Sequence, residues 1–186
     1  MTPIFNIIWI CWLLSEIFLS RLMRSDKADS KDRDKRSLIF IWISITISIS
    51  FGVLAIYYLP SPISKTVIIG YLGLVLIICG MVVRFVAIRT LGRFFTVNLA
   101  LHNNHNLIKT GLYKYIRHPA YTGSLLSFTG LGLSLNNWSS LVIIIIPVLV
   151  SFIYRINIEE KMLLQLFGED YNLYKKYTKK LIPLLY

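Results

Sequence analysis

Long apolar runs separated by shorter polar segments dominate the hydrophobic pattern of this chain. Four of these runs, at about residues 3–23, 37–59, 66–88 and 138–158, approach the roughly 20 residues that a helix needs to cross a bilayer. A fifth run, 121–135, is shorter and contains three glycines, which allow neighbouring helices to approach closely. The pattern predicts an all-α integral membrane protein with about five transmembrane helices.

The last two runs are separated only by Asn136 and Asn137, which are typical turn residues. Residues 121–158 are therefore expected to form a helical hairpin. Pro119 disfavours a helical conformation at His118, so the first helix of this hairpin is expected to begin at about Pro119. Pro147 lies inside the final run and predicts a kink or a local adjustment of that helix.

Lysine and arginine residues are concentrated in every second polar segment. They are frequent at residues 21–36, 89–120 and 155–186, whereas the segment after the second run contains only Lys65. Because cytoplasmic loops of membrane proteins are rich in these residues, we expect the N-terminus outside and the C-terminus in the cytoplasm. The formal net charge of +11 then indicates contact with the lipid bilayer, and we expect no nucleic acid partner.

The polar segment 89–120 is long for a loop between membrane helices, and its apolar content argues against disorder. Gly111 is expected to form a tight turn. A helix that begins at Pro119, with Arg117 and His118 just before it, presents free backbone N–H groups and positive charge. Such a site is suited to a carboxylate or a phosphate group.

Charged residues also lie at the end of the last apolar run. Arg155 and Glu159 are four positions apart and share a helix face, while Glu160 is rotated by about 100° from Glu159. Charged groups there cost free energy unless they are solvated, paired or directed at a ligand. An exposed ion pair is the commonest explanation of this spacing, so the pair alone does not establish a function.

Other residues of potential interest have simpler explanations. The tyrosines at 171, 174 and 177 are expected to form an interfacial packing face beyond a helix end at Gly168. Arg84 is expected to extend its charge from the membrane to the cytoplasmic interface. The histidines at 102, 105 and 118 have no nearby cysteine or acidic ligand and match no zinc signature, so no metal site is expected.

An ordered set of motifs between about Leu91 and Pro183 resembles the isoprenylcysteine carboxyl methyltransferases and the related phospholipid methyltransferases. The set consists of HNLIKTGLY at 105–113, RHPAYTG at 117–123, Arg155 with Glu159 and Glu160, the FG pair at 167–168, and YNLY at 171–174. The resemblance implies one methyltransferase domain over residues 1–186. Residues 1–88 would form membrane helices, and residues 89–186 would form the catalytic half.

The resemblance implies S-adenosyl-L-methionine as methyl donor and S-adenosyl-L-homocysteine as product. The donor would occupy a cytoplasmic pocket between the loop before the hairpin and the C-terminal helix. Its carboxylate would accept from groups near Pro119 or Arg117, and its ammonium would face Glu159 or Glu160. The residues expected to bind the donor are His105, Leu107, Gly111, Tyr113, Arg117, His118, Pro119, Tyr121 and Glu160.

The expected acceptor is the carboxylate of a prenylcysteine-like or other lipophilic molecule. A carboxylate is already nucleophilic at neutral pH, so its methylation needs correct placement and exclusion of water rather than a general base. We expect Arg155 to orient this carboxylate and Glu159 to hold Arg155 in place. An alternative is methylation of a phospholipid amine or another small lipophilic nucleophile; for an amine, Glu159 or His118 would act as the base. A non-enzymatic transporter or scaffold is a third, weaker hypothesis.

Overall fold

The computed structural model describes residues 3–22, 32–92 and 107–182 and is helical throughout these ranges apart from turns and isolated β-bridges. The elements in chain order are α1 (Pro3–Leu22), α2 (Asp32–Tyr58), α3 (Ile68–Leu91), the 3₁₀ helix η2 (Gly111–Lys114), α4 (Pro119–Ser134), α5 (Trp138–Phe167) and α6 (Glu169–Tyr177). The predicted all-α fold is confirmed.

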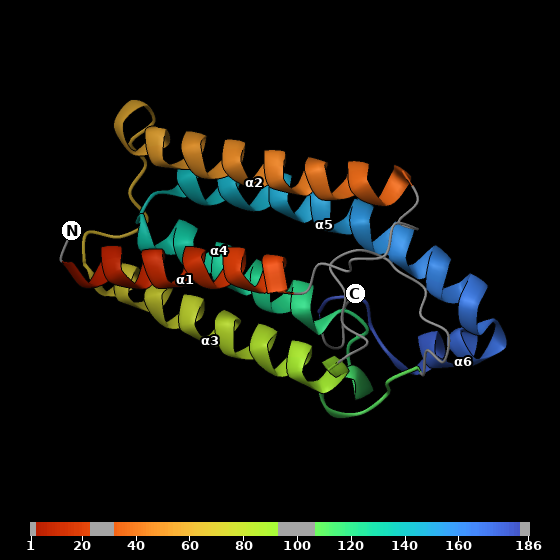
Figure 1. The fold of residues 1–186 in the computed structure, drawn as a ribbon. Helices are drawn as coiled ribbons and strands as arrows, with labels where there is room; N and C mark the ends of the chain where they lie inside the picture. The colour runs from red at the N-terminus through yellow and green to blue at the C-terminus, as the bar shows by residue number, and fades with distance from the viewer. Residues whose placement is uncertain (1–2, 23–31, 93–106, 183–186) are drawn as a thin grey trace.

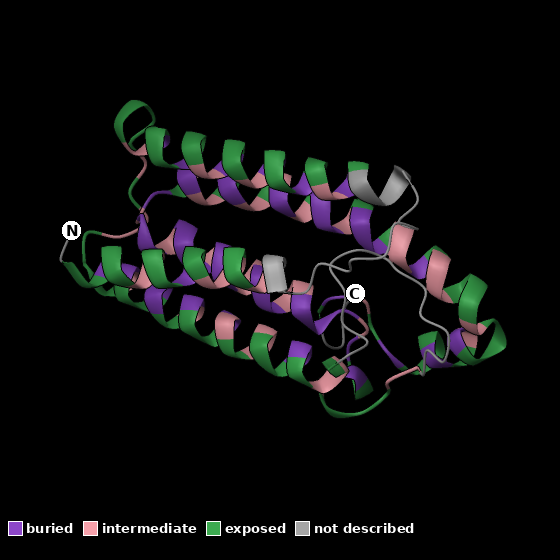
Figure 2. Ribbon diagram, viewed as in Figure 1, coloured by how far each residue is buried: buried purple, intermediate pink, exposed green. Residues whose placement is uncertain are grey.

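Three helices are long and apolar enough to cross a membrane. They are α3, α5 and the Arg36–Tyr58 part of α2, as judged over the described residues. Their outer faces carry exposed large apolar side chains such as Phe51 and Phe85, which is the pattern expected of surfaces in contact with lipid (Figure 2). In α1 the apolar stretch is the shorter Pro3–Leu19, and α4 has only 16 residues. The fourth and fifth membrane spans therefore stay predictions.

The long helices run side by side as two main pairs (Figure 1). Helix α2 packs along α5, and α3 packs along α4. Glycines explain the closeness of the second pair: a Cβ atom at Gly73 would lie 2.5 Å from the carbonyl oxygen of Gly130, and one at Gly80 would lie 2.5 Å from that of Gly123. The two backbones thus approach more closely than larger residues would allow.

Several helix ends lie where local sequence signals predicted them. Helix α4 begins at Pro119 after a non-helical His118, and α5 ends at Gly168, whose φ is +51°. The Asn137 side chain caps α5 by accepting a hydrogen bond from the backbone N–H of Ser140 at 3.0 Å. Helix α5 is continuous through Pro147 and continues past the apolar run 138–158 to Phe167, next to the predicted end at Gly168. Although α4 and α5 follow each other directly, α4 packs mainly on α3 and α5 packs mainly on α2.

The segment after α6 returns to the beginning of α4. Its carbonyl groups accept hydrogen bonds from the backbone N–H groups of Arg117 (to Lys179, 2.8 Å) and His118 (to Lys180, 3.1 Å). The hydroxyl of Thr122 donates to the Leu181 carbonyl at 2.6 Å, and Leu181 is buried. The end of the described chain is thereby fixed against the residues that precede α4.

Candidate functional site

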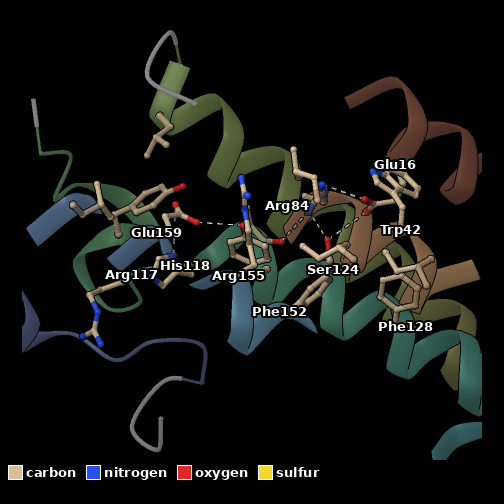
Figure 3. A pocket seen from close by; sticks show the side chains of 18 of the residues that line it. Glu16, Trp42, Arg84, Arg117, His118, Ser124, Phe128, Phe152, Arg155 and Glu159 are labelled. Carbon is tan, nitrogen blue, oxygen red and sulfur yellow. Dashed lines mark hydrogen bonds and ion pairs between the residues drawn. The ribbon is translucent and has the colours of Figure 1, made fainter. Parts of the chain in front are cut away.

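A cavity of about 470 Å³ extends from the polar segments before α4 and after the membrane part of α5, which the sequence analysis places on the cytoplasmic side, into the interior of the helix bundle. Its polar end is formed by η2, the beginning of α4, the last turns of α5 and α6. Its other end lies among α1, α2 and the middle parts of α4 and α5 and is mostly apolar, apart from the side chains of Glu16, Arg84 and Ser124 (Figure 3). The cavity can therefore hold a molecule that is polar at one end and lipophilic at the other.

At the polar end, His118 lies between two carboxylates of α5. Its Nε2 atom is 3.5 Å from Oε1 of Glu160, and its Nδ1 atom is 3.9 Å from Oε1 of Glu159. Pro119 sets the end of the preceding loop, which places the buried His118 ring against α5. Because α5 continues without interruption past its apolar section, Glu159 and Glu160 lie on the same helix, beside His118.

The two carboxylates have different surroundings. Glu160 is buried and accepts from Nε of Arg117 at 2.8 Å, and Nζ of Lys180 lies 3.4 Å from its other oxygen. Glu159 is more exposed, accepts from the Tyr121 hydroxyl at 3.2 Å, and lines the cavity, whereas Glu160 does not line it. Glu159 is therefore the carboxylate of this pair that a ligand can reach.

Arg155 lies at the centre of the cavity wall, between the polar and the apolar end (Figure 3). Its residue is only 1% exposed, and its guanidinium donates to the hydroxyl of Ser37 on α2. The Tyr121 hydroxyl lies beside both Arg155 and Glu159. A buried, anchored cation of this kind can hold an anionic group in one orientation.

Most of the site residues predicted from the sequence come together in this cavity. Leu107, Tyr113, Arg117, His118, Tyr121, Arg155 and Glu159 line it. Gly111, Pro119 and Glu160 support the wall without lining it; Gly111 begins η2 with φ +59°, in agreement with the predicted turn. His105 lies outside the described residues.

Two backbone N–H groups just before α4, those of Arg117 and His118, are not free for a bound carboxylate. Both donate to carbonyl groups of the C-terminal segment, at Lys179 and Lys180, and so are already used. The reason is a long-range backbone pairing that no local pattern indicates. A bound carboxylate would have to accept from other groups.

The tyrosine prediction needs correction, because Tyr171 and Tyr174 are buried and line the cavity, while Tyr177 is 82% exposed. Steps of three residues on a helix of 3.6 residues per turn drift in one direction, so the third tyrosine leaves the face of the first. The Tyr174 hydroxyl donates to the Tyr113 carbonyl at 2.6 Å. The Tyr171 hydroxyl is buried without a hydrogen-bond partner in the part of the chain that the structure describes.

Burial sets the ionisation of these phenols and leads to a testable pH dependence. It raises the pKa of Tyr174 to about 12 and also raises the pKa of Tyr113 and Tyr171. Unfolded tyrosine ionises near pH 10, so the unfolded state is favoured as the pH rises from about 10 to 12. We expect the melting temperature to fall over this range, and to fall less steeply in Tyr174→Phe. Thermal unfolding in detergent measures this, and Tyr177→Phe is the control that should keep the wild-type slope.

Comparison with known proteins identifies the protein family of this chain. A family model described as phospholipid methyltransferase matches residues 68–170. This chain belongs to the phospholipid methyltransferase family. The matched segment begins with α3 and reaches into α6, so it includes most of the polar end of the cavity.

Individual relatives narrow the comparison within this family. The chain is 36% identical over 119 residues to a probable protein-S-isoprenylcysteine O-methyltransferase of Oryza sativa subsp. indica, covering 63% of this chain and 62% of that protein. It is 38% identical over 116 residues to the protein-S-isoprenylcysteine O-methyltransferase of Saccharomyces cerevisiae, covering 61% and 48%. Among solved structures it resembles the eukaryotic intramembrane Ras methyltransferase ICMT (isoprenylcysteine carboxyl methyltransferase), with a TM-score of 0.60, 28% identity, and coverage of 81% of this chain and 52% of that one. The chain thus spans between about half and three fifths of the length of these relatives.

Two residues beside the cavity of this family member were missed by the sequence analysis. Glu16 on α1 forms an ion pair with Arg84, from Oε2 to Nη2 at 3.1 Å, and Ser124 accepts from Nη1 of the same arginine. The prediction that Arg84 extends to the interface is therefore wrong, because its charge is paired between helices. The signal for Glu16 was present: it is the one acidic residue in the first apolar run, and intramembrane acids are usually functional or paired.

Proposed function

We propose that this chain is a membrane enzyme that transfers a methyl group from S-adenosyl-L-methionine to the carboxylate of a prenylcysteine-like or other lipophilic acceptor. The observation that carries the proposal is the position of Arg155, a buried cation on the wall of a cavity that is polar on one side of it and mostly apolar on the other. The printed names of the relatives, protein-S-isoprenylcysteine O-methyltransferases, support the same reaction class.

The residues at the polar end fit the chemical groups of the donor. Leu107, Tyr113 and Phe167 offer an apolar and aromatic surface for adenine. The Tyr171 hydroxyl, which has no hydrogen-bond partner among the described residues, can bond a ribose or adenine atom, and Glu159 can accept from the ammonium group. When bound, the donor supplies an electrophilic methyl group on its sulfonium. The residues that line this part of the cavity would hold that group next to Arg155.

The acceptor would occupy the opposite side of Arg155. The guanidinium would orient the acceptor carboxylate, and the Tyr121 hydroxyl beside Arg155 and Glu159 would help to hold the guanidinium in place. The apolar end, which includes Trp42, would bind the lipid chain and keep water from the reacting groups. A lipid-anchored acceptor would enter sideways between helices from the bilayer.

The proposed membrane arrangement has five spans, with α1 and α4 as the two short ones. The N-terminus would lie outside, and the polar end of the cavity would face the cytoplasm. Its support is the distribution of lysines: Lys175 and Lys176 of α6 and the following Lys179 and Lys180 lie at the same end of the bundle as the polar end of the cavity. The matched segment 68–170 already includes α3, so the division of the domain at residue 89 also stays a prediction.

Methylation of a phospholipid amine is the second candidate reaction. The family model's description favours it, and so does Glu159, which faces the cavity and is positioned to remove a proton from an amine. A carboxylate acceptor needs Arg155 for its orientation, whereas an amine acceptor does not. The two reactions are therefore separable by their dependence on Arg155.

Donor binding and methyl transfer test the proposed function directly. In detergent-purified protein, we expect calorimetry to show S-adenosyl-L-methionine binding, weakened about 3- to 10-fold by Tyr171→Phe because one hydrogen bond is lost. Tyr177→Phe should bind as the wild type does. Labelled methyl should then enter a farnesylated cysteine analogue as a base-labile ester.

Each result of this experiment has a defined meaning. Absence of donor binding by folded wild-type protein would overturn the methyltransferase proposal. Binding without transfer to the carboxylate, but with transfer to phosphatidylethanolamine, would favour the amine reaction. Unchanged affinity in Tyr171→Phe would show that this hydroxyl does not contact the donor.

A further inference from the structure

Exposed basic and aromatic side chains occur together at the end of the bundle that η2, α6 and the segment after α6 form (Figure 1). Tyr115 is 62% exposed and Tyr177 is 82% exposed, although both are large aromatic residues. Three lysines close to them in the sequence, Lys114, Lys176 and Lys179, are exposed as well. We call these five residues the outer patch.

Backbone contacts hold the outer patch at the level where helices leave the membrane. The backbone N–H of Lys179 donates to the Tyr115 carbonyl at 3.1 Å, which joins the segment after α6 to the end of η2. The other end of η2 lies against the last turn of α3, where a Cβ atom at Gly111 would be 3.4 Å from the Thr90 side chain. Helix α3 is long and apolar enough to cross a membrane, and α4 begins at Pro119, just after the patch. The patch therefore lies at the level of the lipid headgroups.

The charge of the outer patch is not balanced within the described part of the chain. The side chains of Lys114, Lys176 and Lys179 form no ion pair with a residue that the structure describes. The acidic pair at 169–170 lies in the first turn of α6, at the opposite end of that helix. Lysines in the last turn of a helix complement its dipole, but Lys114 and Lys179 lie outside α6, so the dipole does not explain the whole patch.

Anionic lipid headgroups match this combination of side chains. Tyrosines are enriched at the interface between membrane and water, and lysines there are attracted to anionic lipids. On α6 the exposed Leu173, Lys176 and Tyr177 share one face because they are three and four positions apart, while Tyr171 on the other face is buried. A helix that lies on a bilayer surface has this amphipathic arrangement.

The inner side of the same two elements forms part of the wall of the donor end. Tyr113 of η2 and Tyr171 and Tyr174 of α6 line the cavity. The Tyr174 hydroxyl connects the two elements by donating to the Tyr113 carbonyl at 2.6 Å. Helix η2 has four residues and α6 has nine, and helices this short are not stable by themselves. The shape of the donor end therefore depends on what η2 and α6 contact on their outer side.

We propose that the outer patch binds the anionic headgroups of the bilayer leaflet at this end of the bundle, and that this contact strengthens donor binding on the inner side of η2 and α6. The second part rests on the proposed function, because it requires that the donor end binds S-adenosyl-L-methionine. Coupling of this kind is reciprocal: a bound donor fixes the same two elements and so favours their contact with the lipid. The patch takes no part in methyl transfer.

Ligand affinity in bilayers of different charge tests the coupling. The protein is reconstituted in nanodiscs of phosphatidylcholine, alone or mixed with phosphatidylglycerol. The ligand is S-adenosyl-L-homocysteine, because it has no net charge and is not concentrated at an anionic surface as the cationic donor would be. We expect calorimetry to show at least about 5-fold tighter binding in the anionic discs, the lower end of the usual coupling between two sites. The difference should shrink at high salt, which screens exposed charges.

Variants that remove charge assign the effect to the outer patch. Lys114→Gln with Lys176→Gln changes two exposed positions, so folding should be preserved. We expect this double variant to bind the ligand as the wild type does in phosphatidylcholine, and to gain about 2-fold or less from phosphatidylglycerol. The matched control is Lys65→Gln, because Lys65 is exposed between α2 and α3, at the opposite end of the bundle. Its loss should leave the full difference between the two lipids.

Three outcomes would overturn the proposal. Equal affinity of the wild type in the two lipids would exclude the coupling. A difference that the double variant keeps in full would show that anionic lipids act elsewhere on the chain. An equal gain from soluble polyglutamate in phosphatidylcholine discs would assign the patch to an acidic polypeptide instead of the lipid.

Failure of the proposed function is distinguishable from these outcomes. If folded wild type binds no S-adenosyl-L-homocysteine in either lipid, the methyltransferase proposal fails, and the melting temperature then decides on the lipid contact. Phosphatidylglycerol should raise the melting temperature of the wild type and of Lys65→Gln, and should raise that of the double variant less. The same melting temperature of the wild type in both lipids would overturn the contact.

Discussion

Replacing Arg155 by alanine is expected to lower methylation of a carboxylate acceptor by about 100-fold, the size of effect for loss of a group that holds a reactant in the reactive geometry. The guanidinium is buried, is anchored by Ser37, and is the cation at the junction of the two ends of the cavity. Arg155→Lys should recover part of the activity, because the charge is kept and the planar fork is lost. Labelled-methyl transfer at saturating donor measures the effect.

Two controls make this result specific to the acceptor. Donor affinity should be nearly unchanged in Arg155→Ala, because the residues that we propose to bind the donor lie on the other side of this position. Ser37→Ala removes only the anchor on α2, so its loss of activity should be much smaller. Equal loss of carboxylate and amine methylation would contradict the orienting role, and retained carboxylate methylation would exclude it.

The features that were predictable from the sequence depend on short-range signals. Three of these features follow from the backbone preferences of one residue and its neighbours: the start of α4 at Pro119, the turn at Gly111 and the end of α5 at Gly168. The three helices that are long and apolar enough to cross a membrane follow from run length alone. The joint position of Arg155 and Glu159 at the site also follows from their spacing, because both lie on the same continuous helix.

The features that were missed depend on contacts between distant parts of the chain. The Glu16–Arg84 pair joins α1 to α3, and the sequence does not indicate which helices are neighbours. The pairing of the C-terminal segment with Arg117 involves Lys179, and it is a backbone contact without a side-chain signature. The burial of Tyr171 results from the position of α6 beneath the cavity, which depends on this same contact.

Arg117 leads to the second large expected effect, which concerns stability. Its Nε donates to the buried Glu160, and its Nη1 donates to the Thr178 carbonyl, so one side chain connects the beginning of α4, the end of α5 and the C-terminal segment. Removing one partner of a buried ion pair costs about 3–5 kcal/mol. We expect Arg117→Ala to lower the melting temperature by roughly 10 °C for a chain of this size and to weaken donor binding.

A double variant distinguishes this structural role from direct contact with the donor. Arg117→Met with Glu160→Leu removes the pair without leaving a buried charge, and we expect it to recover most of the lost stability. Because Glu160 lies behind the cavity wall and is engaged by Arg117, His118 and Lys180, donor affinity should recover together with stability. Thermal unfolding and calorimetry on the same samples measure both quantities. A stable double variant that still fails to bind the donor would instead place Arg117 or Glu160 in contact with it, as the family resemblance implies.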